Sequence, residues 1–473
     1  MSDEDLCYTS AIDLIQRFKT RELSPVDLMQ AIINRSERVN PTINAFADQY
    51  FDRAIEKAKL AEARYRRGNT RALEGIPIVI KDETAIKGER TTHGSLLFRD
   101  RIDTVSAPIV QRIQRAGAII HGRSTAPEFS CAAVCHSLLH GVTRNPWKPD
   151  FTPGGSSGGA AAQLAAGTTI LANGSDIGGS IRIPASCSGI VGFKPPYGRV
   201  PQDPPFNLDT YCHDGPMART VRDCALLENV IAGPSAKDIA SLKPKLRIPE
   251  KFKPIKGWRI AYSVDLSYVE VDDDVRANLL SCMEVFRTLG AEVVEVEVGW
   301  SNKVLAGAMA HLTHIFGAYI SEHYTRHRFD MSNYARAFAS QSRRAHADDF
   351  MTALTIAGEM YQTFGPMLEK HNLFVCPTTA VPAVRAEHDP SSDKITVNGR
   401  DVDPMLGWVM TYPFNILSRC PVLSVPSGLS KDGVPTGIQL VGNTYDDISV
   451  FRAAVALEAE RPWLDCPNRR PRL

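Results

Sequence analysis

Apolar residues in the first seventy positions recur every three or four residues, with charged residues between them. Ser24 and Pro25 precede the clearest of these runs, as a capping residue and a residue favoured at the first helical position. The apolar positions of that run are Val26, Met29, Ile32, Ile33 and Val39. Ser10 offers a second cap, and residues 51–67 predict a third helix with charges on most faces. We therefore predict a helical N-terminal segment, residues 1–70, that packs on a core elsewhere or meets a partner subunit.

From residue 75 onward, short runs of β-branched residues alternate with helical patterns. Strands are indicated at 76–80, 119–120, 169–171, 258–262, 292–296, 373–376, 422–425 and 436–441. Helices are indicated at 108–116, 160–167, 275–289 and 446–458, and a long helical stretch covers 301–370. This alternation is typical of an α/β sheet that helices cover on both faces. We expect 301–370 to form a variable cap over a site, and 461–473 to form a C-terminal tail.

The net charge and the cysteine content indicate which binding partners and which kinds of site are not expected. The 473 residues carry a formal net charge of +1, so no strong field favours nucleic acid or an acidic membrane surface. The first residues are acidic and no long apolar segment follows, so neither a signal peptide nor a membrane span is expected. The ten cysteines are scattered, which favours reduced thiols and a cytoplasmic location. Cys131, Cys135 and His136 lack a second ligand pair, so we expect no metal there.

Glycine and serine concentrate in two clusters. Gly-Gly-Ser-Ser-Gly-Gly occupies 154–159, a helix of small residues follows, and Gly-Ser-Asp-Ile-Gly-Gly-Ser occupies 174–180. Such density requires tight turns or a backbone that approaches a ligand with its N–H groups free. A phosphate loop is not indicated, because its Gly-Lys-Ser or Gly-Lys-Thr is missing. A nucleophile elbow fits Ser156 or Ser157, but its histidine has no identifiable position. The third alternative is a serine nucleophile served by a second serine and a lysine.

The two clusters resemble the pattern of the amidase signature family. In that family, Gly-Gly-Ser-Ser-Gly-Gly and a later Gly-Ser-Asp-x-Gly-Gly-Ser-x-Arg-x-Pro place two serines 24 residues apart, and Ser156 and Ser180 have this spacing. The lysine of the family stands in Gly-x-Pro-x-x-x-Lys-Asp, which matches residues 75–82 and points to Lys81. Shorter matches occur at 91–95, 116–118, 144–147, 192–195 and 437–439, so the similarity runs from about residue 24 to residue 458. Departures at 122–125 and 194–196 leave these catalytic matches intact.

The resemblance implies a fold and a set of catalytic roles. The fold is a single large α/β domain, residues 71–460, with a central mixed, mostly parallel sheet flanked by helices on both faces. Ser180 is expected to be the nucleophile, Lys81 the base, and Ser156, on a cis peptide bond, the proton relay between them. The expected oxyanion hole consists of backbone N–H groups, those of Ile177, Gly178, Gly179 and Ser180.

Other residues of the clusters are expected to support these roles. Ser157 competes with Ser156 for the relay position, and only the resemblance chooses between them. Asp176 and Arg182 flank the second cluster, and we expect them to form a charge pair that holds the turn. Ser130 and Cys131 are expected to bind the substrate, together with the cap and residues 408–412.

Lysine acts as a base only when it is uncharged, and burial beneath the apolar residues 76–80 favours that form of Lys81. Asp82 would oppose this if the two side chains touched. Successive side chains of a strand point to opposite faces, so we expect Asp82 to lie away from Lys81. The competing interpretation is a salt-bridged, purely structural lysine.

The function that this pattern favours is hydrolysis of a small amide, with a neutral aryl or alkyl group, to a carboxylate and ammonia or an amine through an acyl-serine intermediate. No metal or organic cofactor is implied, and the partners are a small-molecule amide and, in one alternative, a second copy of the chain. The first competing function is the glutaminase component of a tRNA-dependent amidotransferase, which has the same three residues and needs a partner subunit. The second is a catalytically silent binding protein on the same fold.

Overall fold

The central element of the molecule is one sheet of eleven strands. The structure is a computed structural model that describes residues 2–464 and 466–473. In spatial order the strands are β1 (Phe46–Gln49), β3 (Ile119–Ser124), β2 (Pro77–Lys81), β6 (Leu171–Asp176), β8 (His213–Ala218), β7 (Val191–Lys194), β14 (Val422–Leu429), β15 (Pro435–Val441), β11 (Leu373–Pro377), β9 (Arg259–Tyr262) and β10 (Glu292–Glu295).

The sheet is mixed, as the resemblance implies, but parallel pairs do not predominate in it. Four neighbouring pairs are parallel, β2 with β3 and β6, and β9 with β10 and β11. The other six pairs of this sheet are antiparallel. The short connection between β14 and β15 explains part of this difference, because a tight turn joins antiparallel strands whereas parallel strands need a long crossover.

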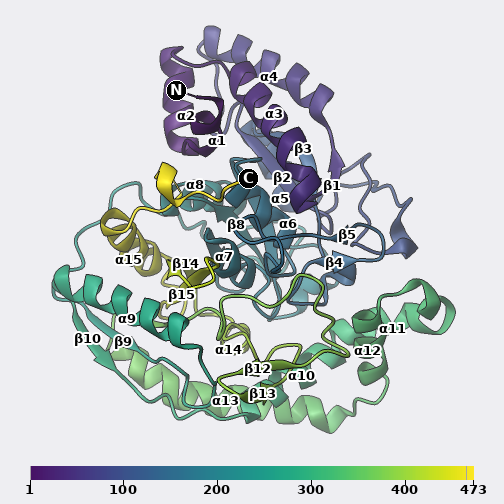
Figure 1. Cartoon of the computed structure of the whole chain (residues 1–473), viewed down its shortest axis with the longest axis vertical. Helices are drawn as coiled ribbons and strands as arrows, with labels where there is room; N and C mark the ends of the chain where they lie inside the picture. Colours follow the sequence, from purple (N-terminus) through teal and green to yellow (C-terminus); the bar gives the residue numbers. More distant parts are fainter. Residues whose placement is uncertain (1, 465) are drawn as a thin grey trace.

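Four helices fill most of the N-terminal segment and lie at the top of the molecule in Figure 1. They are α1 (Asp3–Tyr8), α2 (Ala11–Thr20), α3 (Pro25–Ile43) and α4 (Phe51–Arg66). Ser10 caps α2 and Ser24 caps α3, each through its side-chain oxygen, which confirms both predicted caps. Strand β1 was not predicted, because four residues are too few to show a strand periodicity; it pairs with β3 at the edge of the sheet.

Helices cover both faces of the sheet. One group consists of α6 (Gly158–Ala166) and α7 (Arg182–Ser188), which contact each other. Helix α6 packs on β3, β2, β6 and β8, and α7 packs on β7, β14 and β15. In the other group, α8 (Val221–Ile231), α9 (Asp273–Thr288) and α15 (Asp447–Glu460) pack on the sheet, and α5 (Pro108–Ala116) packs on α8. Every residue of α6 and α7 is buried, so these two helices belong to the core.

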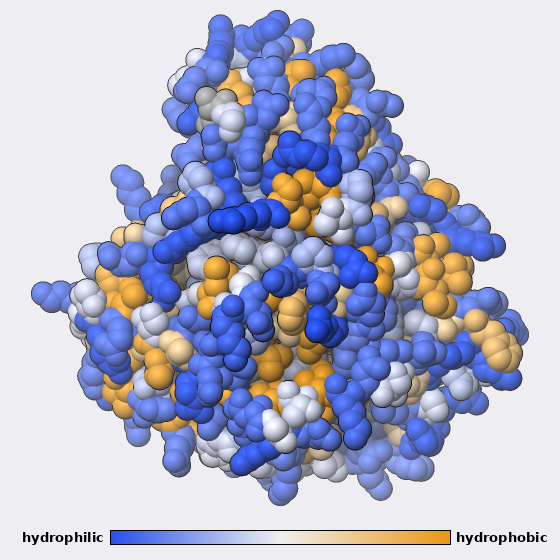
Figure 2. Space-filling view, in the orientation of Figure 1, coloured by the Kyte–Doolittle hydropathy of each residue, from blue (hydrophilic) through white to orange (hydrophobic). Residues whose placement is uncertain are grey.

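The stretch expected to form a cap is helical and lies at the bottom of the molecule in Figure 1. Its helices are α10 (Lys303–His314), α11 (Phe316–His327), α12 (Asn333–Ser342) and α13 (Ala347–Glu369). Among the described residues no single helix has the length and apolarity of a membrane span, although 303–314 and 316–330 together pass that test as a pair bent by 51°. The surface seen in Figure 2 is mostly hydrophilic, with small separate hydrophobic patches.

Smaller elements complete the fold. Two hairpins stand outside the main sheet, β4 (His136–Ser137) with β5 (Gly141–Val142) and β12 (Ile395–Val397) with β13 (Arg400–Val402). A short α-helix, α14 (Pro413–Ile416), precedes β14. The 3-10 helices are η1 (Leu96–Phe98), η2 (Glu128–Ser130), η3 (Phe206–Leu208), η4 (Arg328–Asp330) and η5 (Pro467–Arg469).

Candidate active site

The two glycine-serine clusters form neighbouring loops at the ends of core elements. The first loop leads into α6, and the second joins β6 to α7. The backbone N–H of Ser157 donates a hydrogen bond to the carbonyl oxygen of Ser180 at 3.1 Å, which joins the loops directly. The peptide bond between Gly155 and Ser156 is cis, as the resemblance implies. A side chain at Gly155 would collide with the carbonyl oxygens of two residues in the adjacent 132–134 segment, so this position requires glycine.

Lys81 lies at the end of β2 and is completely buried. Its Nζ is 2.6 Å from the hydroxyl oxygen of Ser156 and 2.8 Å from that of Ser175. Ser175 belongs to β6, which runs parallel to β2, so the pairing of these strands brings lysine and serine together. Ser157 points elsewhere, with its hydroxyl 3.4 Å from the carbonyl oxygen of Ser175. The geometry therefore distinguishes the two serines of the first cluster and brings Ser156 to Lys81.

Asp82 faces away from Lys81, as strand alternation predicts. Its carboxylate accepts hydrogen bonds from the backbone N–H and the hydroxyl of Thr92 and lies 3.2 Å from Nε2 of His140. Burial alone would raise the pKa of Asp82, but the hydrogen bonds from His140 and Thr92 and the nearby charge of Arg123 hold this pKa below its usual value.

Glu83 is the charged neighbour of Lys81 that the sequence analysis missed. Its Oε1 lies 3.1 Å from Nζ of Lys81, and its Oε2 accepts a hydrogen bond from the hydroxyl of Ser130. The available signal was the two-residue period of a strand, which places residues i and i+2 on the same face. The lysine thus has both the expected serine contact and the salt bridge of the competing interpretation.

The second loop presents free backbone donors. Among the described residues, no acceptor is hydrogen bonded to the N–H groups of the four residues expected to form the oxyanion hole, Ile177, Gly178, Gly179 and Ser180. A side chain at Gly178 would meet open space, so this backbone borders a cavity. Gly179 has a φ of +129°, and a side chain there would overlap that of Thr411. Glycine is therefore required where the loop turns.

A buried ion pair holds this loop. Arg182 binds both carboxylate oxygens of Asp176 through Nε and Nη2, each at 2.9 Å. The same guanidinium donates to the carbonyl oxygen of Thr411 at 2.9 Å and to the side chains of Gln439 and Asn415, both at 2.7 Å. Burial would raise the pKa of Asp176, but the charge and hydrogen bonds of Arg182 hold this pKa far below its usual value. The expected charge pair is thus present and also ties the loop to the C-terminal half of the chain.

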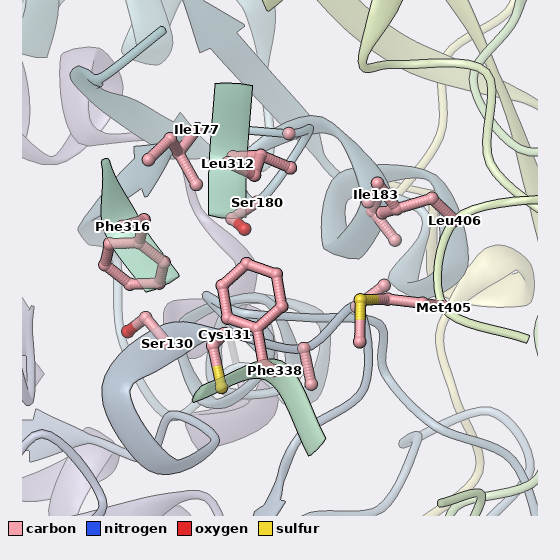
Figure 3. A pocket seen from close by; sticks show the side chains of 13 residues that line it. Ser130, Cys131, Ile177, Ser180, Ile183, Leu312, Phe316, Phe338, Met405 and Leu406 are labelled. Atoms are coloured by element: carbon pink, nitrogen blue, oxygen red, sulfur yellow. The ribbon is translucent and has the colours of Figure 1, made fainter. Parts of the chain in front are cut away.

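Beside the loops lies a cavity (Figure 3). The hydroxyl of Ser180 points into it, and the ring of Phe338 faces this hydroxyl. The described residues that line the cavity include no charged side chain; they are Ser130, Cys131, Ala132, Ala133, Ile177, Gly178, Ser180, Ile183, Leu312, Phe316, Phe338, Met405 and Leu406. The cavity is therefore suited to an uncharged, apolar group.

Part of the set of residues expected in the pocket lines the cavity. Ser130 and Cys131 line the cavity, and the cap contributes three residues from α10, α11 and α12. Residues 408–412 do not line it: Trp408 is fully buried in the core, and residues 405 and 406, a little earlier in the chain, take that position. Phe129 lies behind the wall, stacked on His323 of the cap with ring centroids 5.9 Å apart. Nothing in the sequence singled out the cap residues, because their helical spacing is that of any buried helix face.

The cluster at 131–136 contributes no metal-ligand group. Cys135 is buried with its thiol directed at the backbone oxygen of Thr125, and Nε2 of His136 contacts the carbonyl oxygen of His388 at 2.9 Å. Within residues 2–464 and 466–473, the structure has no group of three or more histidine, cysteine or acidic side chains arranged to hold a metal.

A buried lysine bonded to a serine, a second serine facing a cavity, and free backbone donors beside it are groups of the kind that a serine hydrolase uses. Residues 27–451 match the profile of the family described as Amidase. The chain is 33% identical to an acylamidase of Rhodococcus erythropolis over 98% of both proteins. It is 31% identical to a glutamyl-tRNA(Gln) amidotransferase subunit of Geotalea daltonii, over 95% of this chain and 97% of that protein.

Among solved structures, a bacterial aryl acylamidase of the amidase signature enzymes superposes on this chain with a TM-score of 0.91 and 29% identity, covering 98% of this chain and 99% of the other. The chain belongs to the amidase family, and it is a hydrolase that acts on the carbon–nitrogen bond of amides.

Proposed function

We propose that this amidase cleaves small amides with an uncharged aryl or alkyl group, and that Ser180, Ser156 and Lys81 perform the reaction. The observation that carries the proposal is the 2.6 Å contact between Nζ of Lys81 and the hydroxyl of Ser156, next to an uncharged cavity into which Ser180 points.

The proposed reaction begins with a proton transfer. Uncharged Lys81 takes the proton of Ser156, Ser156 takes that of Ser180, and the oxygen of Ser180 attacks the amide carbon. The negative charge that forms on the amide oxygen is stabilised by the free N–H groups of residues 177–180. The proton returns through Ser156 to the leaving nitrogen, the carbon–nitrogen bond breaks, and ammonia or an amine departs. Water then cleaves the acyl-Ser180 ester by the same proton route and releases the carboxylic acid.

The lining of the cavity supports the substrate class. It consists of aromatic, aliphatic and sulfur-containing side chains, with the hydroxyls of Ser130 and Ser180 as its polar side-chain groups. Burying a charged group among these residues without a partner would cost several kcal/mol, whereas an aryl or alkyl group gains about 25 cal/mol per Å² of apolar surface removed from water. The names of two relatives, an acylamidase and an aryl acylamidase, agree with this class.

The same lining disfavours the competing functions. Free glutamine carries an α-carboxylate and an α-ammonium group, and the described residues of the cavity wall offer neither of them a charged partner. A silent binding protein would not need Lys81 in contact with Ser156 beside free backbone donors. We also propose a homodimer and a cytoplasmic location; the free thiols of all ten cysteines support the second.

The test is a substrate panel on the purified chain. Anilides and simple aliphatic amides should be hydrolysed with a kcat/KM at least about 100-fold above that for glutamine, a discrimination that an unpaired buried charge readily supplies. A fluorophosphonate should label Ser180, as peptide mass spectrometry would show, and Ser180→Ala should abolish both labelling and hydrolysis. Preference for glutamine, or labelling at another serine, would contradict the proposal.

A further inference from the structure

Glu83 connects the catalytic lysine to the wall of the substrate cavity. One carboxylate oxygen lies 3.1 Å from Nζ of Lys81, and the other accepts a hydrogen bond from Ser130, which lines the cavity. The side chain of Glu83 is 16% exposed, so water screens the pair only in part. The mechanism above assigns this carboxylate no role.

The acceptors around Lys81 match the hydrogens of its amino group. Three oxygen atoms surround Nζ, those of Ser156 at 2.6 Å, Ser175 at 2.8 Å and Glu83 at 3.1 Å. A charged lysine has three N–H donors; it donates hydrogen bonds to the two hydroxyls and forms an ion pair with the carboxylate of Glu83. An uncharged lysine has two N–H donors and one lone pair. If the two donors remain on Ser175 and Glu83, the lone pair points at Ser156, where the proposed mechanism needs it.

Other ionisable groups that interact electrostatically with Glu83 or Lys81 come from several segments: His93, Cys135, Cys212, Asp214 and Tyr319. Asp214 is the second carboxyl group near the lysine. Burial, and then the charge of Glu83, raise the pKa of Asp214 to about 8, so Asp214 is uncharged near neutral pH. The charge of Lys81 and the hydrogen bonds from Ser130 and Ser175 keep the pKa of Glu83 low despite its burial. Glu83 is therefore the anionic partner of Lys81 while the lysine carries its proton.

Building on the proposed function, we propose that Glu83 is a positioning residue that directs the lone pair of Lys81 to Ser156 and sets the lower pH limit of activity. The two parts of this role have different requirements. Direction of the lone pair needs an acceptor atom at this position, charged or not. The pH limit needs the negative charge, which favours the protonated lysine and so delays formation of the base as pH rises.

The experiment measures the rate of fluorophosphonate labelling of Ser180, and kcat/KM for an anilide, from pH 5 to pH 10. Glu83→Gln keeps an acceptor for Lys81 and a polar partner for Ser130 but removes the charge. The acidic limb of both profiles should move to lower pH by about 1–3 units, with the plateau rate within a few fold of the wild type. Glu83→Ala removes the acceptor as well, and its plateau rate should fall by about 100-fold or more.

The matched control is Glu89→Gln, which removes an equal charge from the same segment of the chain. Glu89 pairs with Arg53 at the surface and makes no contact with Lys81 among the described contacts, so its profiles should coincide with those of the wild type. If Glu83→Gln does not fold, Glu83→Asp and Glu83→Asn form a second pair that is matched in size and differs in charge. The acidic limb of the asparagine variant should then lie at lower pH than that of the aspartate variant.

The role of Glu83 would be overturned if the pH profiles of Glu83→Gln coincided with those of the wild type or moved to higher pH. Labelling of Ser180 would still support the proposed function in that case. A wild-type chain that the fluorophosphonate does not label at Ser180 would instead overturn the proposed function itself.

Discussion

Tyr334 of the cap is hydrogen bonded to Glu128 in the turn that forms one wall of the cavity. Its hydroxyl accepts the backbone N–H of Glu128 at 2.7 Å and donates to the carbonyl oxygen of His136, also at 2.7 Å. The turn needs such support, because Phe129 and Ser130 have positive φ angles of 53° and 56°, which side-chain-bearing residues rarely adopt. The cap therefore fixes the shape of a pocket wall that belongs to the core of the chain.

Replacing this hydroxyl should loosen the turn. Tyr334→Phe leaves a buried N–H and a half-buried C=O without this partner, so the free energy of unfolding should fall by about 1–3 kcal/mol in urea denaturation. The KM for an anilide should also rise, because Ser130 and Cys131 lose their fixed position. Tyr361→Phe is the control, because Tyr361 is 41% exposed on the same cap. Equal stability of the two variants would show that the hydrogen bonds of Tyr334 do not hold the turn.

Loss of either proton-transfer residue should stop the chemistry and spare the fold. We expect Lys81→Ala and Ser156→Ala each to lower the rate of Ser180 labelling and kcat by about 10²–10⁴-fold or more. The control is Ser157→Ala. The hydroxyl of Ser157 contacts a backbone carbonyl instead of Lys81, so its loss should reduce these rates far less. Circular dichroism would verify folding. A Ser156→Ala variant as fast as the wild type would refute the relay.

The cap should decide which amides enter. Phe338→Ala enlarges the cavity and removes the ring that faces Ser180, so kcat/KM for an anilide should fall by about 10–200-fold. Labelling by a small fluorophosphonate should change little, because the groups that activate Ser180 lie elsewhere. Phe329→Ala, at a cap position that is 80% exposed, should leave both rates unchanged. The expectation fails if the two phenylalanine variants behave alike.

Lys194 should make stability depend on pH. Burial, and then the charge of Arg182, lower the pKa of this fully buried lysine to about 7, whereas in the unfolded chain it lies near 10.4. Between these values the unfolded chain binds the additional proton, so this group makes the free energy of unfolding rise with pH, by about 4 kcal/mol from pH 7 to pH 10.

The measurement compares urea denaturation of the wild type and Lys194→Met at each pH, since the difference isolates Lys194 from other groups that titrate in this range. Lys431→Met, at an exposed lysine, is the control and should follow the wild type. A difference between the wild type and Lys194→Met that stays constant from pH 7 to pH 10 would show that Lys194 remains charged in the folded chain.

Local pattern could predict most of the elements, and motif spacing could predict the contact between Lys81 and Ser156. Ser10 and Ser24 cap their helices as expected, because capping depends on neighbouring residues alone. The contact of Lys81 with Ser156, 75 positions later, followed from a spacing pattern, since a resemblance carries tertiary information that propensity lacks.

The remaining features depend on tertiary packing that the sequence pattern does not encode. Tertiary packing sets the order and direction of the strands, and these make antiparallel pairs more numerous than parallel pairs in the sheet. Phe338 faces Ser180, and Tyr334 is hydrogen bonded to Glu128, because of the way the cap packs on the core. The two-residue period of a strand places Glu83 on the same face as Lys81, but nothing in the sequence indicated that its carboxylate would turn toward Lys81 instead of water.

The groups proposed to perform the chemistry come from one part of the chain, whereas the wall of the cavity is divided mainly between that part and the cap. The proposed catalytic groups all lie between Lys81 and Arg182, whereas the cap contribution to the cavity comes from Leu312, Phe316 and Phe338. Substitutions at these three cap positions are therefore expected to alter which amides fit while the proposed proton route stays intact. Such an arrangement lets a lineage exchange substrates in small steps while the bond-breaking apparatus is inherited unchanged, and it makes α10 to α12 the rational region to randomise when a new amide is sought.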